Sequence, residues 1–246
     1  HGGDENFPGF HRYYFDRREN MMRAMLPHAI CQPLFGTLAS LYPKADWAPR
    51  IFRGKATFQN LARAPIEAYF RSVSAFHPEL KAKVLHQDLL CELNGYDSLD
   101  VLRDYYRRAD TEDPLSRIQY VDIKTYLTDD ILVKVDRASM AHSLEVRAPI
   151  LDHKLMELAA LMPSSMKLRG MNGKYIFKKA LKQLLPASVL HRRKMGFGVP
   201  LAHWFRNDLK ELASSVIFNR TEDALLNEST VKRVWQEHQS GLRDRS

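Results

Sequence analysis

Apolar side chains recur along most of this chain at the spacing of helix faces, and this periodicity limits the fold more than any other feature. Residues 58–76 show it well, although Pro65 inside the run predicts a kink or two shorter helices. Asp97 and Asp113 stand where N-caps are expected, each directly before a further helical run. The best candidate for a strand is residues 144–150. The sequence therefore predicts a mainly α fold with little or no sheet.

Two further stretches carry structural expectations. Thr128, Asp129 and Asp130 favour a cap that starts a separate helix at Ile131. Residues 27–60 are the least regular part of the sequence. We expect a loop packed on the core there, with a lid or a substrate-side wall as the alternative.

Length and charge are those of an ordinary globular protein. With 246 residues the chain can form one large domain or two small ones around a buried core. The formal charge of +8 fits an excess of Lys and Arg on a solvated surface. Nucleic acid is a poorer explanation, because no aromatic platform or recognition helix accompanies the short basic run at residues 192–194. A nucleotide triphosphate or pyrophosphate is the other polyanion that the positive electrostatic field of these basic side chains could attract.

The sequence predicts a cytoplasmic location. No apolar run reaches the roughly 18–20 residues needed to span a bilayer, and the first residues do not resemble a secretory signal. Cys31 and Cys91 have neither metal-site spacing nor a disulfide framework, so we expect both to be buried or idle in a reducing compartment. Because the chain starts at His1 and places paired glycines directly after it, we expect it to be part of a larger protein.

A glycine pair and two acids open the chain, at Gly2, Gly3, Asp4 and Glu5. Paired glycines let the backbone approach a ligand closely and expose its N–H groups. An acid directly after them can bind Mg²⁺ through its carboxylate oxygens. A surface turn that caps a helix would have the same sequence, so both interpretations stay open.

The segment 135–152 mixes charged and small residues beside an apolar helix. Its charged members include Asp136, Arg137, Glu145 and Arg147. Such a mixture predicts a buried polar network, which either fixes the fold or lines a site. Both interpretations stay open; separately, Arg147→Ala is expected to lower stability more than binding.

Lys174 follows Gly173 at the predicted start of a helix. A cation is poorly placed at a helix N-terminus, which makes sense if an anion lies beside it. An ordinary surface lysine is the alternative. Residues 192–200 join three cations to a glycine-containing loop, which could contact phosphate or could simply connect two elements.

Several motifs follow one another in order along the chain: Gly2-Gly3-Asp4-Glu5, Phe7, Gly9, Tyr13, residues 126–152, Asn172-Gly173-Lys174-Tyr175, Leu185-Pro186 and Arg193-Lys194-Met195-Gly196-Phe197. In this order they resemble the glutamine-dependent asparagine synthetase family, especially its bacterial branch. The ordered run is far more specific than any one piece of it. Residues 28–114 match the family poorly.

The resemblance implies an α/β synthetase domain of the ATP-pyrophosphatase class (adenine nucleotide α-hydrolase-like), preceded by a glutaminase domain. Residues 1–246 would be the helical C-terminal portion of that synthetase domain. ATP and Mg²⁺ would convert aspartate or a similar carboxylate into an acyl-adenylate and release pyrophosphate. Ammonia from glutamine would then displace AMP and form an amide. The expected partners are these small molecules and the N-terminal part of the same protein, with no nucleic acid and no membrane.

The resemblance also assigns roles to individual residues. Gly2, Gly3 and Asp4 would bind ATP and pyrophosphate, and Asp4 would bind Mg²⁺. Lys174 would contact the ATP phosphates as the catalytic residue. Glu145 and Arg147 would shape the site, and Asp136 and Arg137 of the same segment are further candidates for this role.

The chain departs from the family pattern in its upstream part. The Ser-Gly-Gly-x-Asp-Ser phosphate loop, the glutaminase nucleophile and most strands of the nucleotide sheet are absent from it, and His1 stands where the family usually has an acid. We therefore expect this chain alone to be inactive. Two alternatives stay open: an ATP-dependent amide- or lactam-forming relative without a glutaminase, and a helical scaffold module that has lost catalysis.

Overall fold

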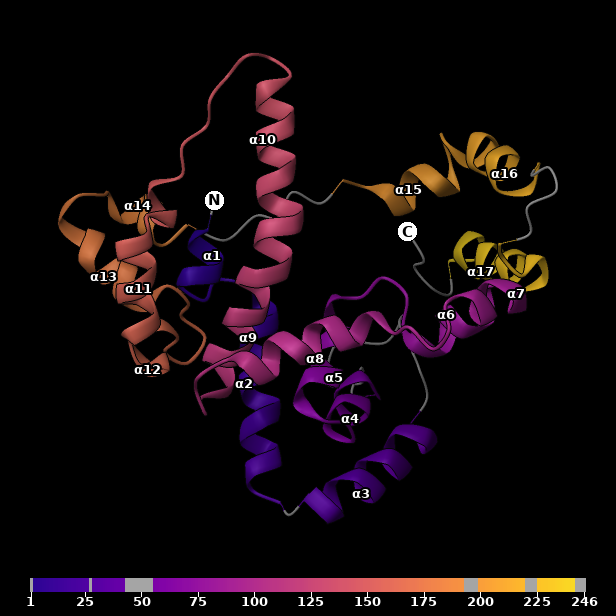
Figure 1. Cartoon of the computed structure of the whole chain (residues 1–246), viewed down its shortest axis with the longest axis horizontal. Helices are drawn as coiled ribbons and strands as arrows, with labels where there is room; N and C mark the ends of the chain where they lie inside the picture. The colour runs from indigo at the N-terminus through magenta and orange to yellow at the C-terminus, as the bar shows by residue number, and fades with distance from the viewer. Residues whose placement is uncertain (1, 27, 43–54, 193–198, 220–224, 242–246) are drawn as a thin grey trace. The chain divides into compact units, whose positions relative to one another are not determined.

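The protein is described by a computed structural model that covers residues 2–26, 28–42, 55–192, 199–219 and 225–241 (Figure 1). Regular structure within these ranges is helical, and extended pairing there is limited to two isolated bridges. The predicted mainly α fold is therefore confirmed. The strand expected at residues 144–150 is wrong: no described segment pairs with that stretch, and it ends in the 3-10 helix η3, Pro149–Leu151.

The chain divides into two compact units. The first comprises His1–Leu41, Ala56–Val73 and Asp97–Arg193, and the second comprises Tyr42–Lys55, Ser74–Tyr96 and Lys194–Ser246. Besides η3, the first unit contains α1 Gly3–Asn6, α2 His11–Ala24, α3 His28–Leu41, α4 Lys55–Leu61, α5 Pro65–Val73, α8 Ser98–Arg108, α9 Pro114–Asp122, η2 Ile123–Leu132, α10 Val133–Met140, α11 His153–Leu161, α12 Ser164–Lys167, α13 Tyr175–Ala180, η4 Leu181–Gln183 and α14 Ala187–Leu190. The second contains α6 Pro78–Val84, α7 Gln87–Glu92, α15 Leu201–Arg206, α16 Lys210–Phe218 and α17 Glu228–Gln239.

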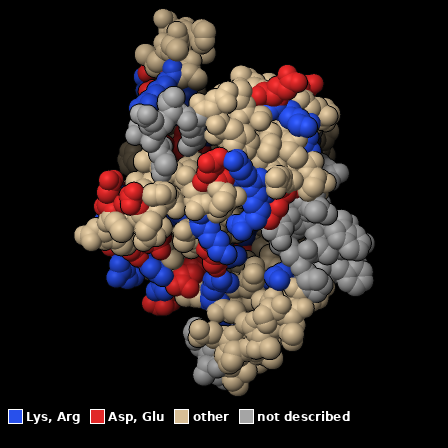
Figure 2. Space-filling view, turned by 90° about the vertical axis from the view of Figure 1, so that its right-hand side faces the viewer, with Lys and Arg blue, Asp and Glu red and all other residues tan. Residues whose placement is uncertain are grey.

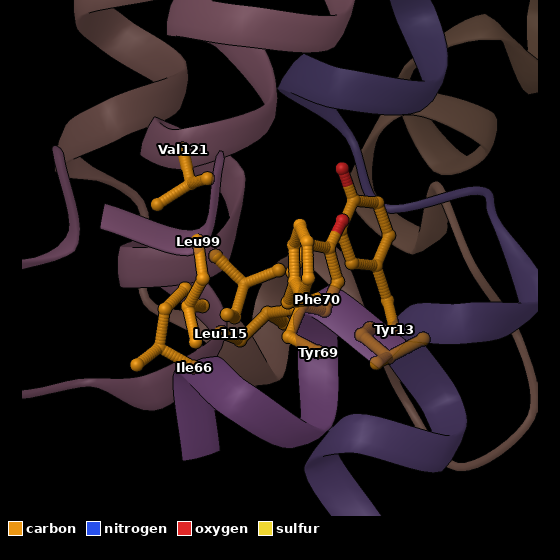
Figure 3. Close-up of a cluster of buried hydrophobic side chains, with 9 residues drawn as sticks. Tyr13, Ile66, Tyr69, Phe70, Leu99, Leu115 and Val121 are labelled. Carbon is orange, nitrogen blue, oxygen red and sulfur yellow. The ribbon is translucent and has the colours of Figure 1, made fainter. Parts of the chain in front are cut away.

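The core of the first unit lies between α2, α5, α8 and α9 (Figure 3). Side chains three or four residues apart share one face of a helix, which is why Leu115, Ile118 and Val121 of α9 enter the core together. The buried members of this cluster are Tyr13, Ile66, Tyr69, Phe70, Leu99, Leu115, Ile118, Val121 and Leu168. Burial of this apolar surface is the main stabilising contribution to the unit.

One buried carboxylate, Asp122 of α9, binds polar groups from two other helices of this core. Its Oδ2 accepts hydrogen bonds from the Arg12 guanidinium at 2.7 Å and from the Tyr13 hydroxyl at 2.5 Å, and its Oδ1 accepts one from the Tyr69 hydroxyl at 2.5 Å. The phenol oxygens of Tyr13 and Tyr69 lie close together in Figure 3. Burial and the negative charge of Asp122 raise the pKa of both tyrosines well above the ordinary value, so both remain donors. The cluster ties α2, α5 and α9 together.

The helix that begins at Pro114 runs without a break to Met140, through α9, the π-helix η2 and α10. The cap expected at Thr128–Asp130 is therefore wrong. The Thr128 hydroxyl donates to the carbonyl of Lys124 at 3.1 Å, which is the back-bonding of a hydroxyl inside a helix rather than a cap. The wider π-type turns absorb the polar run without ending the helix.

Other expectations from local sequence are confirmed where a cap or a proline defines the boundary. Pro65 starts α5 and separates it from α4, and Asp97 and Asp113 cap α8 and α9 by accepting backbone N–H groups. The loop expected at residues 27–60 is wrong over α3, whose Cys31 and Phe35 pack with Leu61, and over residues 55–60, which lie in α4. The remainder of that expectation, at residues 43–54, lies outside the described residues.

The second unit is joined by contacts between its helices. Asn227 caps α17 by accepting the N–H of Thr230 at 3.0 Å. The Arg206 side chain donates to the carbonyl of His238 at 2.8 Å, which attaches α15 to α17.

The described surface is mixed in charge. Figure 2 shows one face on which Lys and Arg are interspersed with Asp and Glu, as expected for a solvated excess of basic residues. Cys31 is buried and Cys91 is exposed, and both are free thiols. No helix among the described residues combines the length and the apolar character that crossing a membrane requires.

Removal of the Asp122 carboxylate is expected to destabilise the first unit strongly. Asp122→Ala leaves the Arg12 charge and two buried hydroxyls without their partner, which should lower the free energy of unfolding by about 3–5 kcal/mol. Urea unfolding measures this effect. Asp100→Ala, which removes an exposed partner of Arg103, is the matched control and should cost less than about 1 kcal/mol. Equal losses for the two variants would contradict the role of Asp122.

Asp16 of α2 should make stability fall as pH rises. Burial raises its pKa from 3.8 to about 7, and its Oδ1 has no hydrogen-bond partner among the described residues. Between about pH 4 and pH 7 the folded state keeps a proton that the unfolded chain has released, so the free energy of unfolding declines across this window, by up to about 4 kcal/mol. Asp16→Asn should flatten the decline in urea unfolding measured at successive pH values.

The exposed Asp110→Asn is the control for this pH series. Burial also raises the pKa of Glu19, so part of the slope should persist in the Asp16 variant. An unchanged slope in Asp16→Asn would show that Asp16 is charged in the folded protein across this range.

Candidate functional site

The opening glycines form a tight turn that starts α1. Gly2 has φ 80° and caps α1 in the left-handed conformation, which glycine adopts without steric cost. A Cβ at Gly2 would overlap the Leu151 side chain of η3. A side chain on Gly3 would come within 3.5 Å of the Lys174 ammonium. The turn therefore requires glycine at residue 2, through its backbone conformation and its contact with η3, whereas a Cβ at residue 3 would make only an ordinary contact.

Asp4 and Lys174 meet at this turn. The Lys174 Nζ lies 3.2 Å from the Asp4 Oδ1, and both side chains are partly exposed, at 29% and 26%. The two residues come from opposite ends of the first unit's sequence. The predicted convergence of this acid and this lysine is thus present in the structure, while their roles toward a nucleotide stay a prediction.

Two short loops interlock to bring these charges together. The backbone N–H of Lys174 donates to the carbonyl of Pro8 at 3.1 Å, and the N–H of Gly9 donates to the carbonyl of Asp4 at 3.2 Å. A Cβ at Gly9 would overlap the Asp4 carboxylate and the Lys174 side chain, and one at Gly173 would overlap the carbonyl of Pro8. Glycine at both positions lets the loops approach closely.

Polar side chains hold α1 against α9 and η3. The Gln119 amide donates to the carbonyls of Glu5 at 2.6 Å and Asn6 at 3.1 Å, and the Asn6 amide donates to the carbonyl of Ile150 at 2.8 Å. The buried Lys167 ammonium donates to Gln119 at 3.4 Å. Burial lowers the pKa of Lys167, although the negative charge of Asp113 opposes this shift. Burial raises the pKa of Glu5, although a backbone hydrogen bond opposes the rise.

The sequence interpretation missed several residues that build this site: Asn6, Pro8, Tyr14 and Gln119. Gln119 offered a usable signal, because it is a polar side chain on the face of α9 that otherwise carries apolar core residues. Gly9 was noted only as part of a motif. The close approach that requires it cannot be recognised until its partner loop is known.

The four residues predicted to shape the site do not form a buried network. Asp136, Arg137, Glu145 and Arg147 are all exposed. The Arg147 guanidinium lies 2.5 Å from the Glu145 carboxylate, with side chains 83% and 68% exposed. Such a surface pair contributes about 1 kcal/mol or less. The expected buried network and the expected stability role of Arg147 are therefore wrong for this chain, because no described element covers this segment; the site-shaping role stays a prediction.

Asp4 is the candidate metal ligand. No group of three or more His, Cys, Asp or Glu side chains among the described residues could hold a metal ion by itself. Mg²⁺ is commonly held by one or two carboxylates together with phosphate oxygens and waters. A single partly exposed carboxylate beside a lysine fits that use. His1 and residues 193–197 of the family-like motif lie outside the described residues.

Comparison with known proteins gives a consistent family assignment. The family model described as asparagine synthase matches residues 1–246. The glutamine-hydrolyzing asparagine synthetase 1 of Bacillus subtilis is 29% identical over 253 residues, which cover 100% of this chain and 37% of that protein. A putative glutamine-hydrolyzing asparagine synthetase of Mycobacterium bovis is 33% identical over 199 residues, 80% of this chain and 30% of that protein. The chain thus spans about a third of the length of these curated relatives. No solved structure matches it.

The close approach of the two loops gives a prediction about glycine. Gly173→Ala should lower the free energy of unfolding by about 1–3 kcal/mol, because the new Cβ meets the backbone carbonyl of Pro8, which cannot move as a side chain can. Gly36→Ala in α3 is the matched control, since nothing lies within 4 Å of its Cβ position. As a substitution inside a helix it should stabilise the protein by about 0.5–1 kcal/mol. Urea unfolding that shows no destabilisation by Gly173→Ala would contradict the interlocked loops.

Proposed function

Because this chain belongs to the asparagine synthase family, we propose that it forms part of the phosphate-binding side of an ATP-dependent ligase. The complete enzyme would use ATP to activate a carboxylate, that of aspartate or a similar compound, as an acyl-adenylate. Ammonia derived from glutamine would then form an amide, with AMP and pyrophosphate as the other products. The parts of the enzyme that hydrolyse glutamine and carry the upstream phosphate loop would lie outside this chain, in keeping with the share of its relatives that it spans.

The observation that carries this proposal is the 3.2 Å approach of the Lys174 ammonium to the Asp4 carboxylate. A carboxylate and an ammonium at this distance can bind the two parts of a metal–phosphate unit together. Asp4 would bind Mg²⁺, and Lys174 would bind phosphate oxygens. Gly2 and Gly3 keep a proposed role beside this pair: both are buried in this chain, and their lack of side chains lets the turn that carries Asp4 pack closely against Leu151 and Lys174.

The proposed chemistry explains why a fixed cation is needed here. A carboxylate oxygen of the acceptor attacks the α-phosphorus of ATP, and the bond from that phosphorus to pyrophosphate breaks. Negative charge builds up on the departing pyrophosphate oxygen, and the Lys174 ammonium stabilises it there. In the second step the nitrogen of ammonia attacks the acyl carbon, the bond from that carbon to the AMP oxygen breaks, and the nitrogen releases one proton to solvent as the amide forms. Mg²⁺, when bound, supplies further neutralisation of phosphate charge.

The four exposed residues of the 136–147 segment keep a proposed role in shaping the site. Since Asp136, Arg137, Glu145 and Arg147 face solvent in this chain, they are accessible to a substrate or to the upstream part of the enzyme. Their contribution would then be made in the complete protein.

Replacement of Lys174 tests the proposed function. In the enzyme that contains this chain, Lys174→Ala should slow ATP–pyrophosphate exchange by about a hundredfold or more, since one positioned charge is lost from the transition state. The melting temperature should change little, because the side chain is partly exposed and its pair with Asp4 is weak.

Lys179→Ala is the matched control for this exchange experiment. It removes an exposed lysine from the same helix, α13, and should leave exchange unchanged. Normal exchange by the Lys174 variant would remove the phosphate role proposed for that residue.

A further inference from the structure

We propose that Tyr14 is a positioning residue for Lys174: its hydroxyl holds the Gly173 turn so that the lysine backbone stays in the conformation that directs the ammonium toward Asp4. The inference rests on the proposed phosphate role of Lys174.

Lys174 has φ 55° and ψ 32°, the left-handed conformation, at the position that caps α13. Residues other than glycine rarely adopt this backbone conformation, because their Cβ crowds the backbone. Strain of this kind persists only where the surroundings determine the conformation, and it is common at functional sites. Something must therefore hold residues 173–174 in place.

Two hydrogen bonds supply that support. The N–H of Lys174 donates to the carbonyl of Pro8 at 3.1 Å, and the backbone of Gly173 hydrogen-bonds the Tyr14 hydroxyl. The Cβ position of Gly173 overlaps both the Pro8 carbonyl and the Tyr14 hydroxyl, so the turn is enclosed between these two groups. Removing either contact would free the turn on one side.

Tyr14 is itself fixed by the core. Its ring packs against the buried cluster of the first unit, so the position of its hydroxyl relative to α2 is fixed. Burial and, less strongly, the negative charge of Asp4 raise the pKa of Tyr14, while the hydrogen bond from Gly173 opposes the rise. The phenol is therefore neutral at ordinary pH and accepts the Gly173 N–H without taking part in proton transfer. Support thus passes from the core through Tyr14 and Gly173 to Lys174.

A double-mutant cycle tests this inference. The affinity of the enzyme containing this chain for magnesium pyrophosphate is measured by titration calorimetry, with Tyr14→Phe made in the wild-type and in the Lys174→Ala background. Tyr14→Phe should weaken binding about fivefold in the wild type, the effect of one lost hydrogen bond on position. It should have no further effect when Lys174 is alanine. Tyr105→Phe, a partly buried tyrosine of the same core, is the control and should leave binding unchanged.

The possible outcomes separate the two proposals. Equal weakening by Tyr14→Phe in both backgrounds would show that Tyr14 does not act through Lys174. If Lys174→Ala weakens binding and Tyr14→Phe does not, this inference alone is overturned. If Lys174→Ala itself binds pyrophosphate normally, the phosphate role fails and this inference fails with it. Should Tyr14→Phe melt at a lower temperature, the titrations are run well below that temperature, where the variant is folded. The same dependence on Lys174 is expected there, and equal weakening in both backgrounds would overturn the inference.

Discussion

The buried carboxylate of Asp122 is the interaction on which the first unit depends. A charge is tolerated in a protein interior only when it is paired and its lone pairs are satisfied, and Asp122 meets both conditions through Arg12, Tyr13 and Tyr69. These partners come from α2 and α5, while Asp122 ends α9. Separation of either α2 or α5 from α9 would therefore leave a buried charge or hydroxyl without its partner. Apolar contacts supply most of the stability, and this polar cluster selects the arrangement.

The same arrangement places the candidate site. Helix α2 begins directly after the Pro8–Gly9 loop, and α9 carries the Gln119 amide that holds α1. When Asp122 fixes α2 against α9, it therefore also fixes the turn that carries Asp4. Tyr14 lies next to Tyr13 on α2, but their hydroxyls have different partners. The Tyr13 hydroxyl donates to the Asp122 carboxylate in the core, and the Tyr14 hydroxyl hydrogen-bonds the Gly173 backbone. A single helix thus couples the core to the site.

Sequence reasoning succeeded where the determining signal is local. Pro65, Asp97 and Asp113 act on the backbone within a few residues of themselves, so their helix boundaries could be predicted. The meeting of Asp4 and Lys174 was predicted only through the family resemblance. The Asp122 cluster, by contrast, consists of residues far apart in the chain, and the sequence around any one of them does not indicate its partners. The exposed 136–147 segment failed for a related reason: a polar, small-residue pattern predicts burial only if another element covers it.

The energetics of the Asp4–Lys174 pair argue that its geometry is not maintained for stability. An ion pair with both side chains about a quarter exposed contributes roughly 1 kcal/mol or less. The left-handed backbone of Lys174 costs about 1–2 kcal/mol, so the pair at best offsets the strain needed to form it. The two glycines that permit the close approach also give up chain entropy on folding. An arrangement with no net stabilisation, yet held by hydrogen bonds from two other segments, is what a preorganised ligand-binding charge requires, because the cost is met before the ligand arrives.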